Sequence, residues 1–305
     1  MVIPRSSLRR QRYPDHSLYT FEGLTIKTDK WDRKEDDRVL VLGTAVHVLM
    51  NYMYHHPELV RDRYFFEPFA GSGPLGLLAL ELGARHSDLL DINPRAVQFV
   101  RDNAAGNGFD ASRYSAIEGD IKTFQPKQKY DVLFANPPFA PVPDGVGMPI
   151  HSNGGADGNA LTDVLLSKLD NLLKPQGEAF LTVFQIEDRH GPTVLASIKK
   201  HIPSRHVELT RMRSKSFDFA ALVHEYTSEV PHKRQEVIAW SERLKEQYGE
   251  CLSFNYYVVH IGKENSTPAP CTLRDYDGEK YGEGFYRFDP EDNLIGVEIH
   301  LFVEK

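Results

Sequence analysis

Apolar residues in the first part of the chain recur at the spacing of a helix. They occupy positions 39, 42, 46, 49 and 53, so they line one face of a helix with 3.6 residues per turn. We therefore predict a helix over residues 36–56, which Pro57 ends because proline lacks the N–H that a helix needs. The sequence ahead of this helix is polar and contains one predicted strand, at 24–28.

From residue 64 onwards, short apolar runs alternate with amphipathic segments. The runs predict strands at 64–67, 87–91, 115–118, 130–135 and 179–184, and the amphipathic segments predict helices at 74–83, 94–107 and 160–173. Strands that alternate with helices form right-handed βαβ units and a parallel sheet that is covered on both faces. Ligands of such sheets bind outside the carboxyl ends of the strands.

The pattern is weaker beyond residue 190. It predicts helices at 192–201 and 234–247, strands at 206–213 and 255–261, and a loop at 263–281. A terminal hairpin of 284–288 and 294–304 is expected, because polar and apolar residues alternate in its second strand. We divide the chain into an N-terminal extension with the leading helix (1–58), a central domain (59–264) and a C-terminal extension (265–305).

Composition adds limits on the class of protein. The chain is 41% hydrophobic and 26% charged, which is typical of a globular protein, and no apolar stretch is long enough to span a membrane. A net charge of −7 argues against a surface that is positive throughout, as duplex DNA would need, but it leaves a local basic patch open. Two cysteines, Cys251 and Cys271, provide no disulfide framework and favour a reducing cytoplasm. No histidines have the spacing of metal ligands, so we expect no metal, and the arginines near the N-terminus predict a mobile basic tail.

A glycine-rich turn separates the strand at 64–67 from the helix at 74–83. Gly71, Gly73 and Gly76 form a G-x-G-x-x-G pattern, in which glycines take positive φ and let a ligand approach the backbone. The helix that follows presents unpaired N–H groups to a polar or anionic ligand. Asp91 lies about 20 residues further on, where an acid binds the ribose of a nucleotide. This pattern alone also fits a dinucleotide-binding oxidoreductase.

Two further features separate these alternatives. Glu67 precedes the glycines, and a carboxylate there would repel a pyrophosphate but attract an ammonium or sulfonium group. The strand at 130–135 runs into Asn136-Pro137-Pro138-Phe139, a segment without a role in hydride transfer. The first feature favours a cofactor that carries positive charge, and the second argues against an oxidoreductase.

These segments resemble class I S-adenosylmethionine-dependent methyltransferases. The resemblance rests on Glu67-Pro-Phe-Ala-Gly-Ser-Gly73, on Leu90-Asp-Ile-Asn-Pro94, on Gly119-Asp-Ile121 and on Asn136-Pro-Pro-Phe139. The last motif is similar to that of the branch that methylates planar nitrogens. Asn103, Asn107 and the glycines of 154–158 are similar to the release-factor glutamine methyltransferases and their small-domain relatives. The resemblance covers roughly residues 60–185. It implies an α/β, Rossmann-like fold with a central, mostly parallel, seven-stranded sheet and helices on both faces, to which the N-terminal segment and the C-terminal hairpin are additions.

The resemblance also implies roles for individual residues. Glu67, Gly71 and Gly73 would surround the methionine part of S-adenosyl-L-methionine, and Asp91 would hold the ribose. Asp120 would accept a hydrogen bond from the adenine amino group, and Ile121 would pack on the ring. The implied cofactor-binding set comprises Glu67, Phe69, Ala70, Gly71, Gly73, Asp91, Ile92, Asp120, Ile121 and Asn136.

The residues Asn136, Pro137, Pro138 and Phe139 are the predicted catalytic segment. An amide or aniline-like nitrogen is a poor nucleophile because its lone pair is delocalised. The Asn136 side-chain carbonyl and the Pro137 backbone carbonyl can accept hydrogen bonds from the two N–H groups of this nitrogen. These bonds orient the nitrogen and stabilise the charge that develops on it. The prolines stiffen the segment, and Phe139 offers a face on which a planar substrate can stack.

The acceptor stays open at this point. Phe139 stands where the glutamine methyltransferases carry tyrosine, so a protein glutamine and a nucleic-acid base are both retained as substrates. We expect a macromolecular partner and no membrane, in the cytoplasm. The alternatives are a small-molecule N-methyltransferase of specialised metabolism, an NAD(P)-linked oxidoreductase and a non-catalytic cofactor-binding subunit, against which Asn136 argues.

Overall fold

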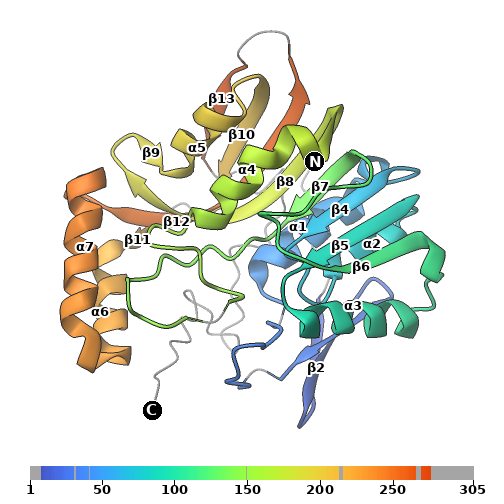
Figure 1. Cartoon of the computed structure of the whole chain (residues 1–305), viewed down its shortest axis with the longest axis horizontal. Coiled ribbons are helices and arrows are strands. Elements are labelled where there is room, and N and C mark those ends of the chain that lie inside the picture. The colour runs from blue at the N-terminus through green and yellow to red at the C-terminus, as the bar shows by residue number, and fades with distance from the viewer. Residues whose placement is uncertain are drawn as a thin grey trace.

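The computed structural model describes residues 8–30, 32–40, 42–148, 150–212, 216–265 and 269–275. Its main sheet runs in the order β13-β10-β12-β8-β7-β4-β5-β6, and the short strands β9 and β11 pair with β8 and β12 (Figure 1). The strand bounds are β4 Tyr64–Pro68, β5 His86–Asp91, β6 Tyr114–Glu118, β7 Tyr130–Ala135, β8 Leu173–Asp188, β9 Gly191–Pro192, β10 Arg205–Arg211, β11 Phe217–Asp218, β12 Ser253–Glu264 and β13 Cys271–Arg274.

The direction of the strands follows from the connections. Helices join β4, β5 and β6, and the strands from β6 to β8 along the sheet are all parallel. Strand β12 runs antiparallel to both β8 and β10. The predicted α/β, Rossmann-like fold with a mostly parallel sheet is therefore confirmed. The predicted count of seven strands was too low, since the described residues form a ten-stranded sheet in which β9, β11 and β13 are additional.

Helices cover both faces of the sheet. Their bounds are α1 Thr44–His55, α2 Pro74–Glu81, α3 Pro94–Gly106, α4 Ala160–Leu172, α5 Val194–His201, α6 Phe219–Glu229 and α7 Arg234–Tyr248, with 3-10 turns at Pro57–Leu59, Ala111–Arg113 and Pro231–Lys233. Successive strand residues point to opposite faces. Phe65 and Phe134 accordingly pack with α1 and α2, whereas Phe66 and Leu133 pack with α4.

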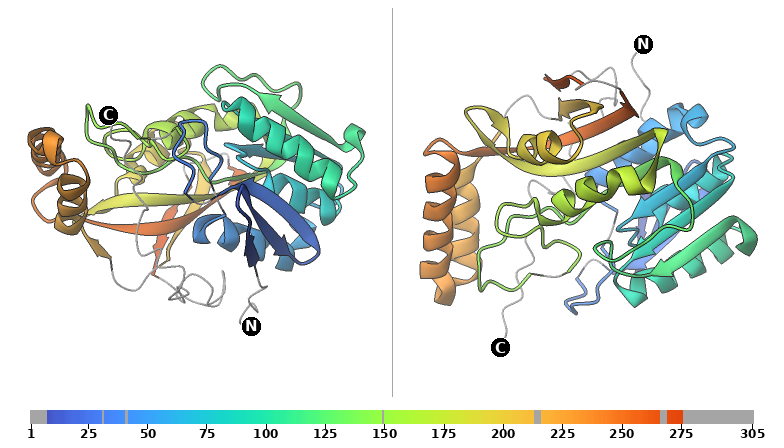
Figure 2. Two further views of the ribbon diagram at one scale, coloured as in Figure 1. Left: turned by 90° about the horizontal axis from the view of Figure 1, so that it is seen from below. Right: turned by 45° about the horizontal axis from the view of Figure 1, so that its top comes forward.

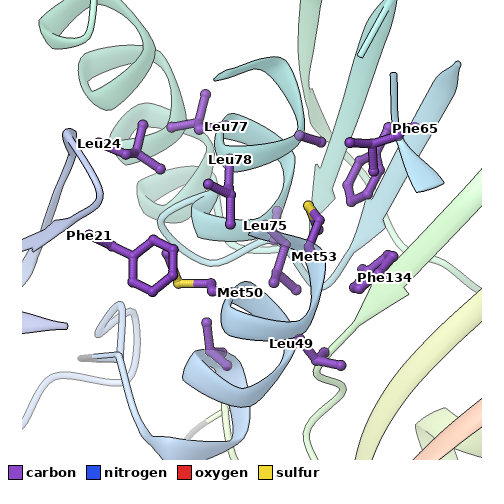
Figure 3. Close-up of a cluster of buried hydrophobic side chains, with 14 of the residues drawn as sticks. Phe21, Leu24, Leu49, Met50, Met53, Phe65, Leu75, Leu77, Leu78 and Phe134 are labelled. Carbon is purple, nitrogen blue, oxygen red and sulfur yellow. The ribbon is translucent and has the colours of Figure 1, made fainter. Parts of the chain in front are cut away.

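A second sheet precedes the first. It consists of β1 Arg9–Arg12, β2 His16–Phe21 and β3 Leu24–Asp29. Phe21 and Leu24 are buried in one cluster with Met50 of α1 and Leu78 of α2 (Figure 3). The N-terminal extension is thus part of the hydrophobic core. The expected mobile tail is wrong for residues 9–12, because β1 pairs with β2 along its whole length.

Side chains of α3 attach β3 to the central domain. The Asn107 amide pairs with the backbone N–H and C=O of Thr25, and the Asn103 amide pairs in the same way with Lys27. The Asn103 amide also donates to the Ser72 carbonyl at 2.9 Å. Asn103 therefore joins the N-terminal sheet directly to the glycine-rich turn.

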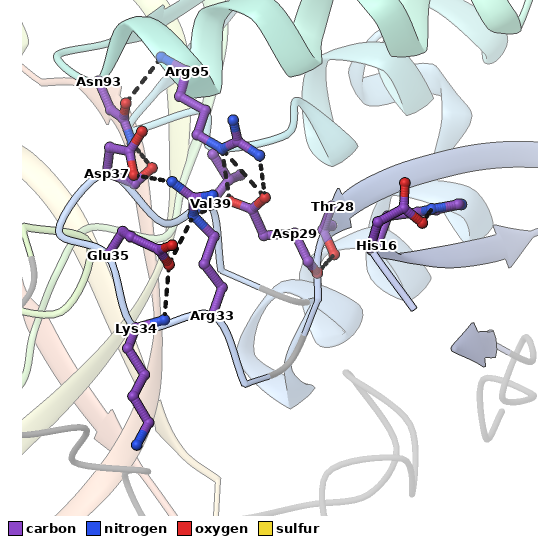
Figure 4. Close-up of polar contacts among 11 residues, drawn as sticks. His16, Thr28, Asp29, Arg33, Lys34, Glu35, Asp37, Val39, Asn93 and Arg95 are labelled. Carbon is purple, nitrogen blue, oxygen red and sulfur yellow. Dashed lines mark hydrogen bonds and ion pairs between the residues drawn. The ribbon is translucent and has the colours of Figure 1, made fainter. Parts of the chain in front are cut away.

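The segment between β3 and α1 is held by charged groups (Figure 4). The buried Asp29 carboxylate accepts the Arg95 Nε–H at 3.0 Å and the backbone N–H of Val39 at 2.8 Å. The Asn93 side chain donates to the Asp37 carbonyl. Because these backbone groups make tertiary contacts, the helix predicted from residue 36 begins only at Thr44, after its N-cap at Gly43.

One other expectation was wrong: the predicted loop at 263–281 contains β13, a strand of four residues that pairs with β10. Helix α6, which buries Phe219, Leu222 and Tyr226, was not predicted. The expected hairpin of 284–288 and 294–304 lies outside the described residues. Within the described ranges, none of the helices has the length and apolar character needed to cross a membrane.

Candidate functional site

One cavity opens at the carboxyl ends of β4, β5, β6 and β7, where the strand order reverses. Its volume is about 1140 Å³. The predicted site residues in its wall are Glu67, Phe69, Ala70, Gly71, Asp91, Ile92, Asp120, Ile121, Asn136, Pro137, Pro138 and Phe139. The structure thus brings together residues from four strand ends, as the position of ligands in such sheets predicts. Gly73 is the one predicted residue outside the cavity wall.

The glycine-rich turn has an unusual backbone. Phe69 has φ 60°, Gly71 has φ 54° and Gly73 has φ 82°. Positive φ is strained for phenylalanine, and such conformations cluster at functional sites. A Cβ on Gly73 would lie 3.0 Å from Leu89 Cδ2, so this glycine serves the close packing at the start of α2.

Glu67 caps the helix that follows the turn. Its buried carboxylate accepts the backbone N–H groups of Leu75 at 3.2 Å and Gly76 at 2.7 Å. These groups lie in the first turn of α2, where an acid is stabilised by the helix dipole. Burial nevertheless raises the pKa of Glu67 to about 8, and the nearby Asp91 carboxylate contributes to this rise. A cation in the cavity would favour the ionised form of Glu67.

Asp91 holds the turn against the end of β5. One carboxylate oxygen accepts the Gly71 N–H at 2.7 Å, and the other accepts the Asn93 N–H at 2.9 Å. Burial raises the pKa of Asp91 despite these two bonds. A carboxylate has about four acceptor positions, so both oxygens can still accept hydroxyl groups of a ribose.

An apolar part of the cavity lies beside Asp91. Ile92 is 48% exposed although it is a large apolar residue, and it faces the cavity together with the buried Ile121. Asp120 closes a turn by accepting the Lys122 N–H through one carboxylate oxygen, Oδ1, at 2.9 Å. Apolar side chains next to a carboxylate are suited to a flat ring that carries an amino group.

Asn136 follows β7 and is half-buried. Its Oδ1 accepts the Thr182 hydroxyl at 2.8 Å, and Thr182 is a buried residue of the neighbouring strand β8. This bond fixes the orientation of the amide and leaves a second lone pair of the oxygen for a ligand. Thr182 was not predicted, because a partner 46 residues away leaves no mark in the local sequence.

Phe139 packs among aromatic rings. Its centroid lies 5.9 Å from that of Tyr256 in an edge-to-face arrangement and 6.1 Å from that of Phe184. Tyr256 also lines the cavity, and so do residues of the loop that follows Phe139. Tyr256 was not predicted as a site residue, because it lies in a predicted strand that carries no chemical motif.

Gly154 and Gly158 pack against the backbone of Phe139. A Cβ on Gly154 would lie 2.7 Å from the Phe139 carbonyl carbon, and one on Gly158 would lie 2.5 Å from the Phe139 oxygen. Gly158 also has φ 81°, which other residues rarely adopt. These glycines therefore support the Asn136–Phe139 segment from behind.

The chain is similar to known proteins over part of its length. Residues 44–144 match the family described as "Conserved hypothetical protein 95". Over 151 residues the chain is 28% identical to a release factor glutamine methyltransferase of Bacillus anthracis. This alignment covers 46% of this chain and 51% of the relative. Over 103 residues the chain is 43% identical to a ribosomal protein L11 methyltransferase of Azotobacter vinelandii. This alignment covers 33% of this chain and 34% of the relative.

Among solved structures, the chain is similar to a Thermus thermophilus 16S rRNA N2 G1207 methyltransferase in complex with AdoMet and guanosine. The TM-score is 0.47 at 13% identity, with 86% of this chain and 51% of that chain covered. The two sequence relatives confirm the resemblance to methyltransferases for part of the chain. The chain spans about half or less of the length of the two sequence relatives described above.

Proposed function

We propose that this protein is an S-adenosyl-L-methionine-dependent methyltransferase that acts on a planar nitrogen. One observation carries the proposal: Glu67, Asp91, Asp120 and Asn136, which the sequence places on four different strand ends, line the same cavity. The methyltransferases that match part of the chain in sequence support the same class.

The cavity fits the chemistry of this cofactor. S-adenosyl-L-methionine would supply a sulfonium-bound methyl group when bound. Asp91 would accept the ribose hydroxyls, while Ile92 and Ile121 would enclose the adenine ring and Asp120 would accept its amino group. Glu67 would supply negative charge near the ammonium and sulfonium groups, whose positive charge would in turn lower its raised pKa.

We assign binding of the methyl-accepting nitrogen to Asn136. With its oxygen oriented by Thr182, it would accept one N–H of the acceptor nitrogen, and the Pro137 carbonyl would accept the other. These bonds hold the nitrogen in line with the methyl group and stabilise the positive charge that develops on it. The proton is lost afterwards, when the nitrogen has become acidic, so a strong base is not needed.

A macromolecular acceptor is the class we favour. One matched relative is named for the release factor and another for a ribosomal protein, and the release factor relative is named as a glutamine methyltransferase. A glutamine amide and the exocyclic amine of a base both present the N–H groups that Asn136 and Pro137 would bind. We also assign the protein to the cytoplasm, in keeping with its free cysteines Cys251 and Cys271.

The test is methyl transfer in a cell lysate. The protein is incubated with radiolabelled S-adenosyl-L-methionine and lysate that has been treated with protease, with nuclease or with neither. Label that is lost only after protease identifies a protein acceptor, and label lost only after nuclease identifies a nucleic acid. Label confined to small molecules would establish the metabolic alternative, and the absence of labelling, with NAD(P)-dependent oxidation instead, would refute the proposal.

A further inference from the structure

Helices α6 and α7 form a pair that lies beside the cavity. The pair is inserted between β11 and β12 and joined by the turn Pro231–Lys233. Figures 1 and 2 show it at the far ends of the long strands β8 and β12. Its buried side chains share a hydrophobic cluster with Val142 and Val146, two residues of the loop that follows Phe139. We call residues 140–148 and 150–158 the acceptor loop.

The helix pair holds both ends of the acceptor loop through hydrogen bonds. The buried Tyr226 hydroxyl of α6 donates to the Pro141 carbonyl. At the other end, the buried Trp240 Nε1–H of α7 donates to the Ala156 carbonyl at 2.7 Å, and the Tyr248 hydroxyl donates to the Asp157 carboxylate at 2.7 Å. Aromatic donors placed in this way combine apolar packing with a directed polar contact.

The two ends of the loop are also bonded to each other. Ala140 N–H donates to Ser152 O, Gly154 N–H donates to Ala140 O, and Val142 N–H donates to Gly155 O, each at 2.9 Å. The 154–158 segment lies against the Phe139 backbone too closely to admit a Cβ at Gly154. A displacement of this loop would therefore be passed on to Phe139 and the predicted catalytic segment.

We propose that the α6–α7 pair is the positioning element of the acceptor site and that Trp240 is its central positioning residue. This inference rests on the proposed function, because it assigns the acceptor to the segment that the loop supports. Trp240 does not line the cavity, so it acts through Ala156 and the glycines rather than by contact with a substrate. The cofactor side of the cavity is built from strand ends and does not depend on the pair.

The test replaces Trp240 with phenylalanine, which keeps an aromatic ring in the cluster but removes the N–H donor. Hydrogen exchange of the acceptor-loop amides should become roughly tenfold faster, since the bond from Trp240 Nε1–H to the Ala156 carbonyl is lost. Turnover should fall by about the same factor while the affinity for S-adenosylhomocysteine, measured by calorimetry, stays unchanged. Ile198→Val, which removes a buried methylene in α5, controls for a general loss of stability and should change neither loop exchange nor turnover.

A second variant tests the contact between the acceptor loop and Phe139 by a change in the loop itself. Gly154→Ala places a Cβ against Phe139 and should lower turnover without weakening cofactor binding. Its control is Gly106→Ala, at the end of α3, where nothing lies within 4 Å of the added Cβ.

Two results would overturn the inference: unchanged loop exchange in Trp240→Phe, or faster exchange with full turnover. A wild-type protein that transfers no methyl group would instead refute the proposed function. The two failures are distinguishable because the exchange experiment needs no acceptor.

Discussion

The two sides of the cavity are built in different ways. On the cofactor side, where we place S-adenosyl-L-methionine, Glu67, Asp91 and Asp120 lie at the ends of parallel strands, and backbone N–H groups at most 20 residues away donate to their carboxylates. The acceptor side consists of Phe139, the loop behind it and Tyr256, held by contacts between residues 84 to 91 positions apart. The cofactor side is therefore local in sequence, and the acceptor side depends on the whole fold.

The two sides also differ in charge. The carboxylates of Glu67, Asp91 and Asp120 line the cofactor side, and burial raises the pKa of two of them, Glu67 and Asp91. Aromatic and apolar groups surround Phe139 on the acceptor side. The cofactor side is therefore suited to a cation, and the acceptor side to a flat, weakly polar group. Variants can therefore separate cofactor binding from methyl transfer.

The largest effect is expected from Asn136→Ala. The variant should lower turnover by about 10²–10³-fold, which is typical for loss of one group that stabilises developing charge. Its affinity for S-adenosylhomocysteine should be nearly that of the wild type, as measured by calorimetry. Asn171→Ala, on the exposed surface of α4, is the matched control and should be fully active. Equal loss of affinity and turnover in Asn136→Ala would show that its role is misassigned.

Asp91→Ala should have the opposite effect. It removes the bonds from the Gly71 and Asn93 N–H groups and the proposed acceptor for the ribose, so the dissociation constant for S-adenosylhomocysteine should rise roughly 10–100-fold. Turnover at saturating cofactor should fall much less. Asp110→Ala removes a carboxylate that caps an exposed turn elsewhere and should leave affinity unchanged. An Asp91→Ala protein with normal affinity would place the ribose somewhere else.

Thr182→Val should give a smaller effect on the acceptor side alone. The substitution preserves shape but removes the hydroxyl that orients Asn136, and the loss of about 1 kcal/mol corresponds to a fall in turnover of roughly fivefold. Cofactor affinity should not change. Thr182→Ser restores the hydroxyl and should recover activity. A Thr182→Val enzyme with full turnover would show that Asn136 is oriented without this bond.

Cofactor binding should also depend on pH. Burial raises the pKa of Glu67 to about 8, so its carboxyl is protonated in the free protein at neutral pH. A bound cation favours ionisation, so the affinity for S-adenosylhomocysteine, which carries the ammonium group, should increase as pH rises towards 8, by at most about tenfold per pH unit. Calorimetry across this range measures the slope.

The stability of the free protein should change in the opposite direction. The pKa of Glu67 is higher in the folded state than the usual 4.5, so this carboxyl stabilises the fold at low pH and loses that contribution as pH rises through about 8. Glu67→Gln should remove the pH dependence of both cofactor affinity and stability. Pronounced pH slopes that persist in Glu67→Gln would mean that another group titrates.

The contrast between the two sides explains how much could be predicted from sequence. Strands β4 to β7 and helices α2 to α4 were predicted within a few residues, because each combines a clear apolar period with a glycine or proline at its boundary. Helix α6 and strand β13 were missed, since their backbone is specified by tertiary packing and by pairing with distant strands. The contacts of Thr182 and Trp240 could not be predicted for the same reason: neither partner lies nearby in the chain.

The central claim is that the carboxylate-lined cavity binds S-adenosyl-L-methionine rather than a dinucleotide. Its most direct test is calorimetric titration of the full chain with S-adenosyl-L-methionine and, separately, with NAD. We predict saturable binding of S-adenosyl-L-methionine that Asp91→Ala weakens, and no measurable binding of NAD. Binding of NAD without binding of S-adenosyl-L-methionine would contradict this account of the site.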